Sequence, residues 1–202
     1  MNVYEAIEKR RSVRKFQQKP IPYPVLEKLL NASRLAPSGG NLQAWEFIII
    51  DAPDLCAKVF PLTSWASYFG TEGSPKEGER PVAYAVFLNN KIRNKHIPLS
   101  IWLADISAAI ENLILAAVEE GIGTCWLGSM QVKKVQMENL VKLLSVPETH
   151  SLEFLVALGY PAQANQTEEI ENDGSIKYHT DQQGVIRVPK RKLEHILHRN
   201  GF

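Results

Sequence analysis

The stretch ISAAIENLILAAV, residues 106–118, decides the fold of this chain, because only Ser107, Glu111 and Asn112 in it are polar. At the helical rise of about 1.5 Å per residue it spans about 20 Å. A helix that is apolar on nearly all sides must be buried on nearly all sides. The segment 98–120 therefore predicts a helix that is either central to the core or shared with a second subunit. We expect no membrane span, because the apolar run is short and acidic residues lie in it and just before it.

Predicted helices and short apolar runs alternate on either side of this helix. The runs have the length and the β-branched content of buried strands, and they lie at 45–50, 82–88 and 152–161. Apolar residues at helical spacing predict further helices at 2–10, 24–35, 54–60 and 132–144.

Two regions give weaker patterns. Residues 63–80 hold aromatic residues, then glycines and a proline among charges. We expect a mobile excursion there, either a flap on the substrate side or an ordinary surface loop. The C-terminal region is polar, and we expect an exposed loop at 162–173, a small hairpin of 176–178 and 185–188 around Asp181–Gly184, and helix-like spacing at 189–199.

The composition is that of a globular protein with one substantial core. The chain has 202 residues, 45% apolar and 22% charged, and a formal net charge of +1. No strongly basic field exists to attract a nucleic acid. The two cysteines, Cys56 and Cys125, form no disulfide framework, which fits a reducing cytoplasm. We expect a single domain over residues 1–202, cytoplasmic and without a signal region.

The stretch RRSVRKF, residues 10–16, is the first candidate site. If the backbone is extended there, alternate side chains share a side, so Arg10, Ser12 and Arg14 point one way and Arg11 points the other. Two guanidinium groups and a hydroxyl on one edge make a cradle for a phosphate and a planar ring. The alternative is that these basic residues sit at the end of a helix and favour its dipole.

Two glycine-containing stretches are the other candidates, namely APSGGNLQ at 36–43 and GIGTCWLG at 121–128. The first is a loop by its turn residues. The second begins with a helix C-cap and continues as a short strand or turn, and it lacks the spacing of the dinucleotide fingerprint. Glycines 39, 40, 123 and 128 allow the backbone to approach a ligand closely, or they only serve turn geometry. His195 and His198 have no further ligands beside them, so we expect no metal site.

Taken together, these stretches resemble the nitroreductase family of flavin-dependent oxidoreductases. The matching pieces follow one another along the chain, and each is weak alone. They are 10–16, Ala36–Ser38 with Asn41 and Gln43–Trp45, 105–117, 121–128 and the basic cluster 190–192. The resemblance implies an α+β fold in which helices wrap a mostly antiparallel central sheet and the C-terminal tail embraces the partner subunit. It further implies a homodimer with FMN at the interface, which takes NAD(P)H and a small-molecule acceptor and needs neither nucleic acid nor membrane.

The resemblance also assigns roles. The basic stretch at 10–16 would contact the phosphate, the ribityl chain and, through Arg14, the flavin N1–O2 edge, where a cation favours the negative charge of the reduced ring. The 36–43 loop would line the ring from the partner chain, residues 126–128 would approach its face and N5, and two residues of the 190–192 cluster would reach the phosphate. No catalytic side chain is assigned, because hydride transfer itself needs no acid or base. The implied cofactor residues are Arg10, Arg11, Ser12, Arg14, Pro37, Ser38, Gly39, Asn41, Trp126, Leu127, Gly128, Lys190 and Arg191.

The implied activity moves a hydride from NAD(P)H through the flavin to nitroaromatics, quinones or similar electron-poor acceptors by a ping-pong mechanism. Alternatives are a dehalogenase-like or dehydrogenase-like flavoenzyme of the same fold, or a flavin store or sensor without turnover. Two departures from the family pattern stand out. Ala44 occupies a position where the family often has proline, and residues 63–80 match poorly, which leaves the substrate open.

Overall fold

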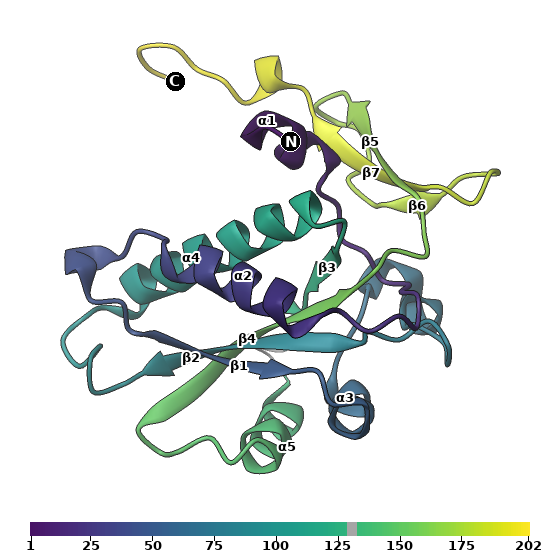
Figure 1. The fold of residues 1–202 in the computed structure, drawn as a ribbon. Helices are drawn as coiled ribbons and strands as arrows, with labels where there is room; N and C mark the ends of the chain where they lie inside the picture. The colour runs from purple at the N-terminus through teal and green to yellow at the C-terminus, as the bar shows by residue number, and fades with distance from the viewer. Residues whose placement is uncertain (129–132) are drawn as a thin grey trace.

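A computed structural model describes residues 1–128 and 133–202. Its central sheet is antiparallel throughout, with the strand order β1-β2-β4-β3. A smaller sheet has the order β5-β7-β6, with β5 parallel to β7 and β6 antiparallel to it (Figure 1). The strands are β1 (Trp45–Ile50), β2 (Ala83–Asn90), β3 (Gly123–Trp126), β4 (His150–Gly159), β5 (Asn165–Ile170), β6 (His179–Thr180) and β7 (Ile186–Arg191).

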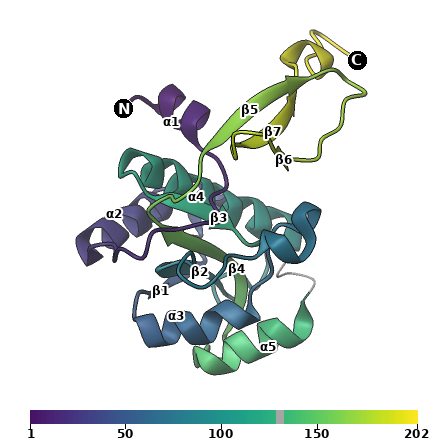
Figure 2. The ribbon, with the colours of Figure 1, turned by 90° about the vertical axis from the view of Figure 1, so that its right-hand side faces the viewer.

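Helices cover both faces of the central sheet. Figure 2 shows α2 (Tyr23–Arg34) and α4 (Leu99–Glu119) on one face and α3 (Pro53–Val59) and α5 (Lys134–Leu143) on the other. Alternate residues of β2 therefore enter two different cores: Phe87 packs on the α4 side and Tyr84 on the α3 side, both fully buried. A strand that is buried on both faces has one continuous run of apolar residues, and such runs predict these strands from the sequence.

Local signals place the helix starts. α1 (Val3–Lys9) begins with a capping box in which Asn2 and Glu5 bond each other's backbone N–H groups. α2 and α3 begin with proline in the first two positions, where a missing N–H costs no helical bond. The N-terminal amine lies 3.0 Å from Glu119 Oε1, so α1 is tied to the C-terminal end of α4.

The apolar segment 106–118 belongs to α4. Its buried residues face the core, whereas Leu99 and Ile101 at its start are 63% and 41% exposed. By length and composition alone this 21-residue helix is long and apolar enough to cross a membrane. The 13-residue length behind the expectation of no membrane span was too short, because the helix begins at Leu99. The expectation itself is not contradicted, since a core helix passes the same test, and α4 packs against α2 and the sheet.

Most predicted elements are confirmed, and the errors gather in the C-terminal region. The predicted loop at 162–173 contains β5, whose polar residues pair with β7 and leave no apolar signal. The hairpin exists, but its first strand is 179–180 rather than 176–178. Residues 189–199 are not a continuous helix, because β7 runs to Arg191 and only the 3-10 turn Leu193–His195 follows. The start of the predicted helix 132–144 lies partly outside the described residues.

Candidate functional site

The stretch 10–16 runs extended beside β3 rather than continuing α1. The Val13 N–H donates to the Thr124 carbonyl at 2.8 Å, and Ser12 forms a parallel bridge with Thr124. Phe16 forms an antiparallel bridge with Pro161 just beyond β4. Because α1 ends at Lys9, the residues from Arg10 onward are not the last turn of a helix. The extended alternative of the sequence analysis is confirmed.

Two glycines hold this stretch in place. Gly123 of β3 pairs in register with Gly159 of β4. A Cβ on Gly123 would lie 2.8 Å from Val13 Cγ2, and one on Gly159 would lie 2.7 Å from Phe16 Cδ1. The space beside the Gly123 Cα is therefore filled by Val13, which gives this glycine a packing role.

Arg14 is a half-buried cation with unused donor capacity. Its backbone N–H donates to Gln163 Oε1 at 2.8 Å, and its guanidinium lies 4.7 Å from the centre of the Tyr178 ring. Its Nε is buried, and within the described residues it has no hydrogen-bond partner and the side chain has no ion pair with a carboxylate. Burial raises the pKa of the neighbouring Cys125 thiol to about 11, against the opposing effects of the Arg14 charge and of a hydrogen bond with the Arg14 side chain. Cys125 is thus a neutral core residue, and Nε is the donor of Arg14 that lacks an acceptor among the described residues.

The side chains of Arg10 and Arg11 have different partners, as expected of neighbouring residues on an extended backbone. Arg10 Nε lies 3.9 Å from Glu111 Oε1 on α4. Arg11 donates to the Arg10 carbonyl, and burial followed by the Arg10 charge lowers the pKa of Arg11. Arg11 lines a cavity of about 250 Å³ with the end of α4, whereas Arg14 lines a different cavity of about 170 Å³ with Phe69 and neighbouring residues. Arg11 therefore points away from the side that Arg14 serves.

Residues 126–128 lie at the end of β3, next to Arg14. The Trp126 ring is perpendicular to Phe154 at 5.1 Å, and its Nε1 is buried without a partner among the described residues. Leu127 is buried and donates its N–H to the Leu155 carbonyl at 2.9 Å. Gly128 is exposed, and no atom of the described residues lies within 4 Å of a Cβ placed on it. This segment directly follows Cys125, which contacts Arg14.

The 36–43 loop follows the C-terminal end of α2 and lies at the N-terminal end of α4, whereas the extended stretch 10–16 runs beside β3, beyond the other end of these helices (Figure 1). The Gly39 N–H donates to both carboxylate oxygens of Asp105 at 3.0 Å, and a Cβ on Gly39 would meet Ile101 Cγ2 at 2.8 Å. Gly39 therefore allows close packing against α4, and its predicted contact with the flavin stays a prediction. Pro37 and Asn41 are exposed and Ser38 is half-buried. One chain does not bring this loop to Arg14.

The basic cluster 190–192 ends β7. Lys192 forms a close ion pair with Glu171, which raises the pKa of Lys192. Lys190 is exposed, and within the described residues the Arg191 side chain donates to the His195 carbonyl at 3.2 Å and to no other acceptor. The charge of Lys192 is thus already compensated, and Lys190 and Arg191 are the members of the cluster that remain available.

Sequence reasoning missed three contributors to this site: Gln163, Tyr178 and Gly159. Tyr178 packs against Tyr68 and Phe69 with ring centres 5.0 Å apart in each pair, so it joins the 63–80 region to Arg14. The 63–80 region itself holds the 3-10 turn Ser67–Gly73. Gln163 and Tyr178 sit in polar surroundings without a periodic pattern, and no sequence signal singles them out. The predicted mobility of residues 63–80 stays a prediction.

The model of the nitroreductase family matches residues 7–66 and 75–160, which is well over half of the chain. The chain belongs to the nitroreductase family. The gap in the match falls inside the 63–80 region, where the sequence resemblance also failed.

Relatives and solved structures agree with this membership. A protein of Archaeoglobus fulgidus with the provisional name NADH dehydrogenase/NAD(P)H nitroreductase is 37% identical over 152 residues, which cover 75% of this chain and 81% of that protein. The iodotyrosine deiodinase of Thermotoga neapolitana is 28% identical over 79% of this chain and 88% of its own length. A provisionally named nitroreductase of Desulfovibrio desulfuricans, solved in complex with FMN, has a TM-score of 0.70 and 23% identity, covering 100% of this chain and 98% of that one.

Proposed function

We propose that this nitroreductase is an FMN-dependent oxidoreductase that takes a hydride from NAD(P)H and passes it to nitroaromatics, quinones or similar electron-poor acceptors by a ping-pong mechanism. Residues 1–202 would act as one cytoplasmic domain. The observation that carries the proposal is the half-buried Arg14 guanidinium, whose Nε has no partner among the described residues and which stands beside the end of β3. A fixed cation at this place favours negative charge on a bound ring.

The residues present fit FMN. Trp126 Nε1 and Arg14 Nε are buried donors without partners among the described residues, and they lie on neighbouring segments. Ser12 and Arg10 are proposed to contact the ribityl chain and phosphate, and Lys190 and Arg191 add exposed positive charge. When bound, FMN supplies a ring that accepts and donates the hydride. The protein holds that ring, counters its charge with Arg14, and leaves an approach at Gly128.

The site is proposed to be completed by a second copy of the chain. Several apolar side chains on α1, α4 and the loop after α2 are exposed, among them Val3, Leu35 and Leu99. Burying them in a homodimer removes that area from water. It would also carry the 36–43 loop, which lies far from Arg14 in its own chain, toward the Arg14 of the partner. The exposed residues after β7 would embrace the partner subunit.

Spectroscopy of the purified protein tests the function. We expect a yellow dimer with flavin absorbance, bleached by NADH or NADPH under anaerobic conditions and restored by a quinone or nitroaromatic. A yellow protein that neither nicotinamide bleaches is the result expected of a store or sensor, and it would contradict the proposed turnover. A colourless protein that does not take up added FMN would contradict the cofactor assignment as well.

Replacing both free basic residues of the tail tests the phosphate contact. Lys190→Gln with Arg191→Gln should weaken FMN affinity by about twofold to thirtyfold, since each solvent-exposed ion pair contributes about 0.2–1 kcal/mol. The loss should shrink as salt concentration rises. Fluorescence titration with FMN measures it, and Lys192→Gln is the matched control, because the charge of Lys192 is paired with Glu171. Equal losses in both proteins would remove the tail from the phosphate site.

A dehalogenase-like activity on halogenated phenols is the second candidate, and the deiodinase relative favours it. It would use the same flavin and the same Arg14. Halide release from an iodinated phenol by the NAD(P)H-reduced protein, measured beside nitroaromatic reduction, separates the two candidates.

A further inference from the structure

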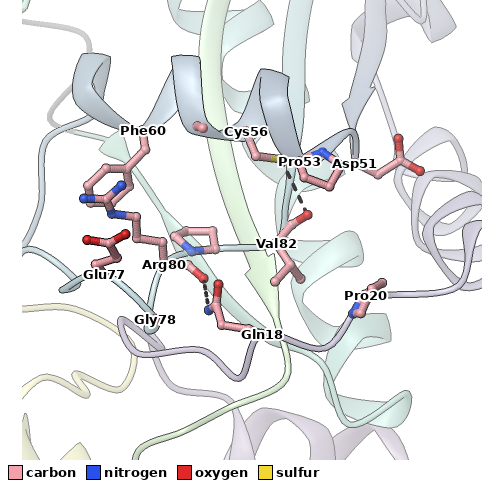
Figure 3. A pocket seen from close by; sticks show the side chains of 12 residues that line it. Gln18, Pro20, Asp51, Pro53, Cys56, Phe60, Glu77, Gly78, Arg80 and Val82 are labelled. Atoms are coloured by element: carbon pink, nitrogen blue, oxygen red, sulfur yellow. Dashed lines mark hydrogen bonds between the residues drawn. The ribbon is translucent and has the colours of Figure 1, made fainter.

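A cavity of about 350 Å³ on the α3 side of the central sheet has no task in the proposed function. Figure 3 shows it between α3, the segment 77–82 and the Gln18–Pro20 stretch. Most of its wall is apolar, including Pro20, Pro53, Ala57, Phe60, Pro81 and Val82. Apolar walls with a few polar groups at this volume are typical of a small-molecule site.

Arg80 is the positively charged residue in the lining of this cavity. Its guanidinium carbon lies 4.4 Å from the centre of the Phe60 ring, and its carbonyl accepts a hydrogen bond from Gln18 Nε2 at 3.0 Å. Phe60 packs in turn against Trp65 at 6.1 Å. These contacts fix the cation before any ligand arrives, which lowers the entropic cost of binding to it.

One donor of Arg80, its Nε, has no acceptor in the described part of the chain. Its Nε is buried and has no hydrogen-bond partner within residues 1–128 and 133–202, and no ion pair joins the side chain to a carboxylate of that part of the chain. A buried donor without an acceptor is unfavourable, and a carboxylate that offers two oxygens to a guanidinium is its best complement.

The other charges of the cavity restrict the ligand. Asp51 and Glu77 line it as well, at opposite ends in Figure 3, and both are exposed to solvent. Solvent screens them, but together they disfavour a ligand with several negative charges, such as a dinucleotide. The Cys56 thiol at the floor donates weakly to the Ile50 and Val82 carbonyls, and burial raises its pKa to about 11. It is therefore protonated at neutral pH, and the cavity is suited to binding rather than to nucleophilic chemistry.

We propose that this cavity binds a small monocarboxylic acid with an apolar body. The carboxylate pairs with Arg80, and the body lies against Pro53, Ala57 and Val82. The site is separate from the flavin site and does not depend on the proposed oxidoreductase activity.

Fluorine NMR with para-fluorobenzoate as the probe tests this assignment on the full-length protein, with and without saturating FMN. Binding should be equal in both samples. Arg80→Gln should weaken it by about tenfold or more, since a charge-assisted bond is lost, and Arg93→Gln, at an exposed arginine near the end of β2, should leave it unchanged. Ala57→Trp fills the cavity from an exposed position on α3 and should also abolish binding, even if Arg80→Gln fails to fold.

Three results would overturn the proposal. They are binding that survives both Arg80→Gln and Ala57→Trp, equal binding of the neutral para-fluorobenzamide, and loss of the probe on addition of FMN, which would place it in the flavin site. Failure of the protein to bind FMN would leave this test intact, so the two proposals fail separately.

Discussion

Arg14→Ala should slow reduction of the bound flavin by NAD(P)H by about a hundredfold, the usual effect of removing one donor from a site of developing negative charge. The flavin reduction potential should fall by about 60 mV, because 30 mV corresponds to about 1.4 kcal/mol for a two-electron couple. The direction follows from charge: the cation stabilises the reduced, negatively charged ring more than the oxidised ring. Stopped-flow reduction and a dye-coupled redox titration measure the two quantities.

Two further variants separate charge from structure. Arg14→Lys keeps the charge without the planar fork, so it should recover most of the potential but less of the rate. Arg34→Ala removes an exposed arginine on α2 and should change neither. A potential that stays at the wild-type value in Arg14→Ala, with only thermal stability reduced, would show that Arg14 is structural and would remove the observation on which the proposed function depends.

The central sheet and the helices could be predicted from the sequence because the spacing of their apolar residues matches the faces that are buried. β1 was predicted with the bounds that the structure shows, since a strand covered on both faces is apolar throughout. β5 was missed because its stability comes from pairing with β7, and backbone hydrogen bonds leave no trace in side-chain polarity. The same limit hid Gln163, whose side chain holds the Arg14 backbone from 149 positions away.

The sequence allows only part of the candidate site to be predicted, for a related reason. Motif order predicted Arg14 and residues 126–128 as site residues, but it did not show which glycines lie against a neighbouring side chain. Gly39 and Gly123 lie against Ile101 and Val13, and only the three-dimensional arrangement reveals those contacts. Likewise, the sequence does not show which of the three basic residues 190–192 has a free charge. In the structure Lys192 is paired with Glu171.

Gly159→Ala should destabilise the fold and weaken FMN binding together. The added methyl group would lie 2.7 Å from Phe16 Cδ1 and 2.9 Å from Phe16 Cβ, and the ring is fully buried and has no room to retreat. Overpacking of this kind costs about 1–3 kcal/mol, which lowers the melting temperature by about 2–12 °C for a chain of this size. Because Phe16 and Arg14 belong to one extended stretch, displacement of the ring should also move Arg14.

The cause of this loss can be isolated with a second substitution. Phe16→Ala removes Cδ1 and Cγ, two of the three Phe16 atoms that the new methyl group meets, so the double variant should be more stable than the sum of the two single changes predicts. Gly128→Ala is the control, since its added methyl group would meet no atom of the described residues within 4 Å, and its melting temperature should match that of the wild type. Strict additivity of Gly159→Ala and Phe16→Ala in urea unfolding would mean that the two residues do not lock the stretch in place. The alignment of Arg14 would then need another explanation, such as its bond to Gln163 or its contact with Tyr178.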